Sequence, residues 1–126
     1  MFDGVVMDID DNRRARDALT AQFTDVTWRG ERGLELGGIL MLPEQTSGPV
    51  PLVVIVHGGP TAISRPSFVG TSGTYPIEQW LARGAVILEP NYRGSAGYGR
   101  DWRTGIYRHM GGHDLNDVVD GARWLV

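Results

Sequence analysis

The residue types that could take part in chemistry gather in the tetrapeptide HGGP at residues 57–60. It follows the apolar run LVVIV at residues 52–56, which is typical of a buried β-strand. Glycine lacks a Cβ, so the Gly-Gly pair permits positive φ and lets a ligand approach the backbone closely. Such a turn can present a backbone N–H to the negative oxygen that develops during acyl transfer. The alternative is a tight turn with no function.

No serine in the sequence has the spacing of a catalytic nucleophile. A nucleophile elbow reads G-x-S-x-G, because the turn must clear both the strand before it and the helix after it. Ser72 and Ser95 each have a glycine two residues away on one side only, and the remaining serines fit less well: Ser47, Ser64 and Ser67. The sequence therefore contains the turn without the nucleophile.

The acidic residues and histidines form no catalytic or metal-binding pattern. Asp101, Asp114 and Asp117 lie where helices are expected to begin, and acidic side chains are favourable there. His109 and His113 are four residues apart, but two glycines interrupt the helix between them and no third ligand is evident. We therefore expect no metal ion and no cofactor.

Composition indicates one small globular domain and excludes several classes of partner. The chain has 126 residues, of which 41% are hydrophobic and 21% charged, with a net charge of −3. The arginines are scattered, so we expect no nucleic-acid partner. No apolar run has membrane-spanning or signal-peptide character, so no membrane partner is expected. The absence of cysteine excludes disulfides and fits a reducing compartment such as the cytoplasm.

Hydrophobic periodicity predicts an α/β fold. The expected elements, in chain order, are a hairpin over residues 26–42, a strand over 52–56, a helix over 76–83, a strand over 85–88, and helices over 101–110 and 114–126. The run at 52–56 is apolar on both faces and predicts a central strand covered by helices. Pro90 is expected to end the next strand. Residues 1–24 read as a linker or the tail of a preceding domain, and residues 25–126 as the domain itself.

Three separated segments resemble the catalytic domain of the prolyl oligopeptidase family of serine peptidases, and most of all its acylaminoacyl-peptidase and dipeptidyl-peptidase-like branches. They are HGGP at 57–60, NYRGSAGYG at 91–99 and GGHDLNDV at 111–118, in the family's order. The resemblance implies an α/β-hydrolase fold with a Ser…Asp…His triad in that chain order. This chain would supply the N-terminal half of that fold, an antiparallel hairpin leading into a parallel sheet, with the nucleophile beyond residue 126.

The resemblance also implies roles for single residues. The backbone N–H of Gly59 would be the oxyanion-hole donor, while His57 and Gly58 would support the turn. Arg93 would pack below the active site, bonded to carboxylates or carbonyls. The substrate of the parent protein would be a short peptide, cleaved through an acyl-enzyme, and this chain alone would be inactive. Two alternatives remain open: part of a carboxylesterase or lipase, and a non-catalytic binding module.

In the implied fold, the strand that carries the nucleophile pairs beside residues 52–56. Without that neighbour, residues 52–56 would form a sheet edge with unpaired N–H and C=O groups, which favours pairing with another chain. We therefore expect the isolated chain to self-associate.

Overall fold

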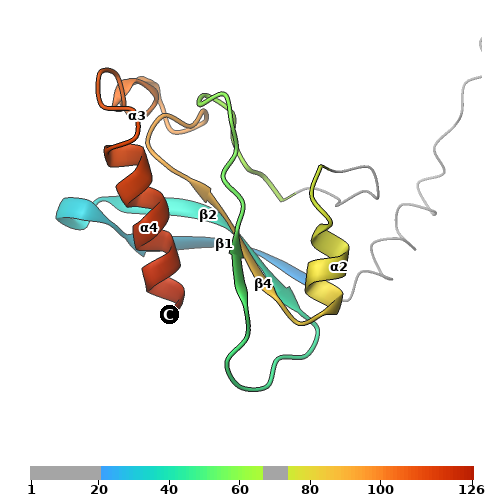
Figure 1. Cartoon of the computed structure of the whole chain (residues 1–126). Helices are drawn as coiled ribbons and strands as arrows, with labels where there is room; N and C mark the ends of the chain where they lie inside the picture. Colours follow the sequence, from blue (N-terminus) through green and yellow to red (C-terminus); the bar gives the residue numbers. More distant parts are fainter. Residues whose placement is uncertain (1–20, 67–73) are drawn as a thin grey trace, which may run out of the picture.

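A computed structural model describes residues 21–66 and 74–126 and places their strands in one mixed sheet (Figure 1). The strands are β1 (Ala21–Arg29), β2 (Glu35–Pro43), β3 (Leu52–Val54) and β4 (Val86–Asn91). Their order is β1-β2-β4-β3; β2 is antiparallel to β1 and β4, and β3 is parallel to β4. The 3-10 helix η1 (Glu31–Gly33) closes the β1–β2 hairpin. The expected hairpin and the parallel strand pair are both present.

Helices cover the two faces of this sheet. α2 (Ile77–Ala82) packs on β2 and β4, and α4 (His113–Leu125) packs on β4 and β1 from the other side (Figure 1). The short α3 (Arg100–Thr104) lies between β4 and α4 in the chain. The structure is therefore the helix-flanked α/β arrangement that the sequence predicts.

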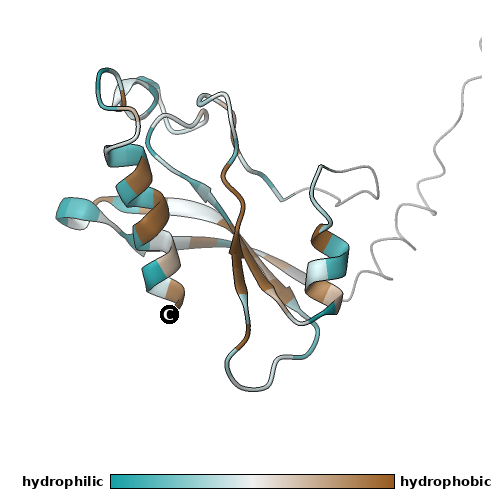
Figure 2. Cartoon of the chain, in the orientation of Figure 1, coloured by the Kyte–Doolittle hydropathy of each residue, from teal (hydrophilic) through white to brown (hydrophobic). Residues whose placement is uncertain are grey.

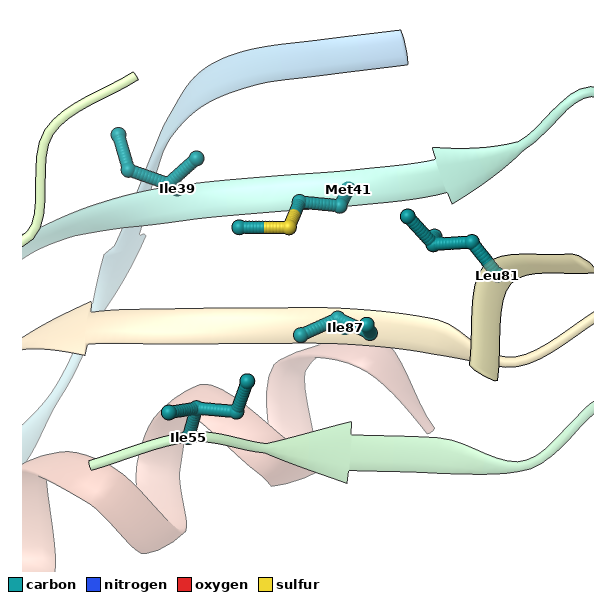
Figure 3. Packing of buried hydrophobic residues seen from close by; sticks show 5 residues of the cluster. All are labelled: Ile39, Met41, Ile55, Leu81 and Ile87. Atoms are coloured by element: carbon teal, nitrogen blue, oxygen red, sulfur yellow. The ribbon is translucent and has the colours of Figure 1, made fainter. Parts of the chain in front are cut away.

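The core consists of one hydrophobic cluster on each face, because successive strand residues point to opposite faces. The cluster under α2 is shown in Figure 3 and contains Ile39, Met41, Ile55, Leu81 and Ile87. The cluster under α4 contains Trp28, Leu36, Leu40 and Leu88. Helix α4 approaches the sheet closely at Gly121, where a Cβ would lie 2.8 Å from the ring of Trp28 and 3.1 Å from Leu88.

Two expected element ends are wrong, both for identifiable reasons. Strand β4 continues through Pro90, which pairs with Gly38 of β2. A Cβ at Gly38 would lie 2.6 Å from the backbone oxygen of Glu89, 3.0 Å from the ring of Trp28 and 3.1 Å from Cα of Pro90, so a glycine lets β2 approach this end of β4 closely. The helix expected over 101–110 ends at Thr104 with Gly105 as its C-cap. Its continuation is replaced by turns that place Ile106 in the interior, only 1% exposed.

The apolar pattern of residues 52–56 predicts a central strand, and the implied fold places them at a sheet edge when the strand that carries the nucleophile is not beside them. β3 lies at the edge of the sheet in the part of the chain that the structure describes, and its residues are half-buried. Figure 2 shows that the segment is hydrophobic along its length, and Val56 remains 46% exposed. At the other end, β1 begins at Ala21, so residues 21–24 of the expected linker pair with β2, while residues 1–20 lie outside the described residues.

None of the described helices combines the length and the apolar character needed to cross a membrane.

Candidate oxyanion site and its supports

The HGGP turn begins just beyond β3, at the carboxyl end of the parallel strand pair. Gly58 and Gly59 are both exposed. Gly59 has a φ of 118°, and a Cβ there would lie 3.0 Å from the backbone nitrogens of Thr61 and Ala62. The backbone conformation and the neighbouring amides therefore both require glycine at this position. The Gly59 N–H donates to no acceptor among the described residues, so it is available to a ligand.

His57 is fixed between the turn and the loop that follows β4. Its Nε2 lies 2.8 Å from Oγ of Ser95, a side chain with no exposed surface. Its ring stacks on that of Tyr92 with centroids 4.6 Å apart. The Tyr92 hydroxyl donates to the backbone carbonyl of His57 at 2.5 Å. Burial raises the pKa of Tyr92, with the charge of Asp114 as a smaller cause, so the phenol keeps its proton at neutral pH.

The same loop also holds the residues that follow the turn. Asn91, only 3% exposed, accepts from the Ser64 N–H at 2.8 Å and donates to the Ser64 carbonyl at 2.9 Å. The Ala96 N–H donates to the Ala62 carbonyl at 3.0 Å. The segment NYRGSA at 91–96 therefore contacts the HGGP turn and its continuation at several points, which fixes the position of both.

Arg93, in the same segment, contacts two carboxylates. Its Nη2 is 2.7 Å from Asp117 and 3.1 Å from Glu31, and its Nε also donates to Asp117 at 2.8 Å. Hydrogen bonding to Asp117 is the largest cause of the raised pKa of Arg93. Hydrogen bonds from Arg93 and then His113 lower the pKa of Glu31. The cluster joins η1, the loop after β4 and α4.

The position of Asp117 differs from the expectation that it lies at the start of a helix. Helix α4 begins at His113, its N-cap is Gly112, and no side chain caps it. Asp117 therefore lies in the second turn, where it is fully buried against Arg93. One sequence signal could have identified this buried ion pair. Asp117 is an acidic residue next to the apolar Val118, on the face of a helix that meets a sheet. Ser95 and Tyr92 carried no comparable signal, because their shared partner His57 is 38 and 35 residues away, respectively.

The other candidates are not brought together into a site. The rings of His109 and His113 are 5.3 Å apart, and His113 Nδ1 lies 3.1 Å from Glu31. Among the described residues no group of three or more His, Cys, Asp or Glu side chains could hold a metal ion. Ser67 and Ser72 lie outside the described residues. An apolar hollow of about 240 Å³ adjoins the turn, lined by Val56, Tyr92, Gly111, Asp114, Leu115 and Val118.

Comparisons with known proteins agree with the fold. Residues 74–126 match the model of the prolyl oligopeptidase family. Dipeptidyl aminopeptidase BIII of Pseudoxanthomonas mexicana is 41% identical over 83 residues, which are 65% of this chain and 11% of that protein. The human acylamino-acid-releasing enzyme is 36% identical over 90 residues, 68% of this chain and 11% of that protein. Uncomplexed Pyrococcus horikoshii acylaminoacyl peptidase superposes with a TM-score of 0.71 and 27% identity, over 90% of this chain and 18% of that one.

The chain thus spans between 11% and 18% of these three relatives. Its described sheet and helices match the N-terminal half of the α/β-hydrolase fold of the solved peptidases. The family match, the relatives and the fold agree with one another, and they confirm the resemblance of this chain to the prolyl oligopeptidase family of serine peptidases.

Proposed function

We propose that this chain supplies the oxyanion-binding turn of a serine peptidase that cleaves short peptides through an acyl-enzyme. The observation that carries the proposal is Gly59, an exposed residue whose N–H donates to no acceptor within the described residues, on a turn held by His57. A preorganised N–H of this kind stabilises the oxygen that becomes negative as an acyl carbon is attacked. The peptide substrate is inferred from the relatives, which are named as aminopeptidases and acylamino-acid-releasing enzymes.

The nucleophile, the acid and the base of the triad are assigned to polypeptide outside residues 1–126. Ser95 and His57 are within hydrogen-bond distance, as a nucleophile and a base would be, but the Ser95 side chain is completely buried. A buried hydroxyl cannot reach a substrate carbonyl. This pair is therefore excluded as a catalytic serine and its base.

We expect the 126-residue chain to show no turnover of an activated ester above the uncatalysed rate, and no labelling by a serine-directed fluorophosphonate. The matched test is the same reading frame extended downstream, which we expect to encode G-x-S-x-G and to hydrolyse aminoacyl-peptide substrates. Faster cleavage of simple esters than of peptides by the extended chain would favour the esterase alternative. An extended frame without that motif would favour a non-catalytic module.

We further propose that the isolated chain pairs with a second copy through β3. This strand lies at the sheet edge within the described residues, and Val56 beside it is 46% exposed. We expect light scattering after size exclusion to show a mass that rises with concentration. The substitution Val56→Lys should oppose pairing, because a charge at an edge strand discourages strand addition. Tyr107→Lys is the matched control, since Tyr107 is 64% exposed but lies outside the sheet. A monomer at all concentrations would refute the pairing.

A further inference from the structure

We infer that the buried hydroxyl of Ser95, acting through the ring of His57, sets the direction of the Gly59 N–H. Ser95 and His57 are thus positioning residues, and neither touches the substrate. This inference rests on the function proposed for Gly59, but it also predicts a spectroscopic property of this chain that does not depend on catalysis.

The first step is the tautomer of His57. Its Nδ1 lies 3.1 Å from the Gly58 carbonyl oxygen, which can only accept a hydrogen bond. The other neighbour of Nδ1 is the Tyr92 hydroxyl at 3.3 Å, which already donates its only proton to the His57 carbonyl. Both neighbours therefore present acceptors, and the ring proton of neutral His57 belongs on Nδ1.

The second step is the role of Ser95. With the proton on Nδ1, Nε2 is an acceptor, and Ser95 Oγ at 2.8 Å is the group that donates to it. Because Ser95 is fully buried, no water replaces this hydroxyl on the buried side of the ring. The Ser95 hydroxyl consequently favours the one tautomer that can donate to Gly58. The tautomer of a histidine is generally set in this way by the partner of its other nitrogen.

The third step passes from His57 to Gly59. The peptide group between Gly58 and Gly59 is planar and trans, so its C=O and its N–H point in opposite directions. The hydrogen bond from His57 Nδ1 fixes the carbonyl and thereby fixes the N–H. Neither glycine has a side chain to resist rotation of this peptide, and both are exposed. The contact with His57 is therefore what holds the orientation of the Gly59 N–H.

The first test is nitrogen-15 NMR of the His57 ring in the 126-residue chain, in solution or under magic-angle spinning. We expect the neutral ring to carry its proton on Nδ1. In Ser95→Ala we expect a mixture of the two tautomers and a shifted Gly59 amide resonance. Ser47→Ala, which removes an exposed loop hydroxyl, is the control and should change neither signal. A wild-type ring protonated on Nε2, or an unchanged tautomer in Ser95→Ala, would overturn the inference.

The second test uses two isosteres of His57 in the longer polypeptide that carries the triad. In His57→Asn the amide nitrogen takes the place of Nδ1 and can still donate to Gly58; in His57→Gln it takes the place of Nε2 and cannot. We expect kcat to fall about tenfold to a hundredfold in His57→Gln, with KM little changed, and to fall less in His57→Asn. Equal losses in the two variants would refute the positioning role. If instead a Gly59 substitution left kcat unchanged, the proposed function itself would fail.

Discussion

Asp117→Ala is expected to lower the free energy of unfolding by about 3–5 kcal/mol, the usual cost of removing one partner from a buried ion pair. Asp117 is fully buried, and the Arg93 side chain that it accepts from is only 16% exposed. The variant would leave the guanidinium inside the fold with Glu31 as its remaining carboxylate. Domain stabilities are commonly about 5–15 kcal/mol, so much of the stability would be lost. Denaturant unfolding followed by tryptophan fluorescence and circular dichroism measures the change.

The matched control is Glu35→Ala. Glu35 pairs with Arg29 at 3.5 Å, but the side chains of Arg29 and Glu35 are 70% and 63% exposed. The loss should therefore stay below about 1 kcal/mol. A further check is the double variant Asp117→Leu with Arg93→Met, which leaves no unpaired charge and should be more stable than Asp117→Ala. Equal losses of unfolding free energy in Asp117→Ala and Glu35→Ala would show that the buried pair contributes no more stability than the exposed one.

Gly59→Ala is expected to reduce kcat by about 10²–10³ in the longer polypeptide that carries the triad, which is typical of losing one oxyanion-hole donor. The new Cβ would meet the amides of Thr61 and Ala62 at 3.0 Å in a backbone conformation unsuited to alanine. The peptide must shift, and its N–H shifts with it. Because this N–H would act mainly in the transition state, kcat and kcat/KM should fall together.

Gly48→Ala is the control that distinguishes loss of the oxyanion-hole donor from the effect of backbone strain alone. Gly48 also has a positive φ, 73°, but a Cβ there has no atom within 4 Å, and the residue lies in an exposed loop. It should lose a little stability and keep its kcat. Steady-state kinetics on a peptide substrate compares the two variants, and an unchanged kcat in Gly59→Ala would remove Gly59 from the oxyanion hole.

Much of the fold could be predicted from local sequence. Alternating hydrophobic residues revealed the hairpin, and the continuous apolar run at 52–56 revealed a strand. Within the described residues this strand lies at the sheet edge, as expected without the strand that carries the nucleophile. The apolar run itself reports burial and not which neighbour provides it. The end of the next strand was also placed wrongly: it continues through Pro90, which pairs with Gly38, a residue much earlier in the chain.

Only the part of the candidate site that consists of neighbouring residues in the chain could be predicted from the sequence. The two glycines identified the turn, since their conformational freedom is readable from the sequence. The supports of the turn were not readable, because each joins residues distant in the chain: Ser95 to His57, Asn91 to Ser64, and Asp117 to Arg93. Hydrogen bonds between distant residues leave no periodic pattern, so they became visible only in the folded structure.

The pairing of Pro90 with Gly38 has a consequence for the accuracy of the site. A one-residue slip of β4 along β2 would turn Ile87 and Leu88, which are completely buried in the clusters on opposite faces of the sheet, toward the wrong faces. These two side chains therefore fix the register in which Pro90 lies opposite Gly38. Since Asn91, Tyr92 and Arg93 follow Pro90 directly, this register determines which side chains arrive at the turn.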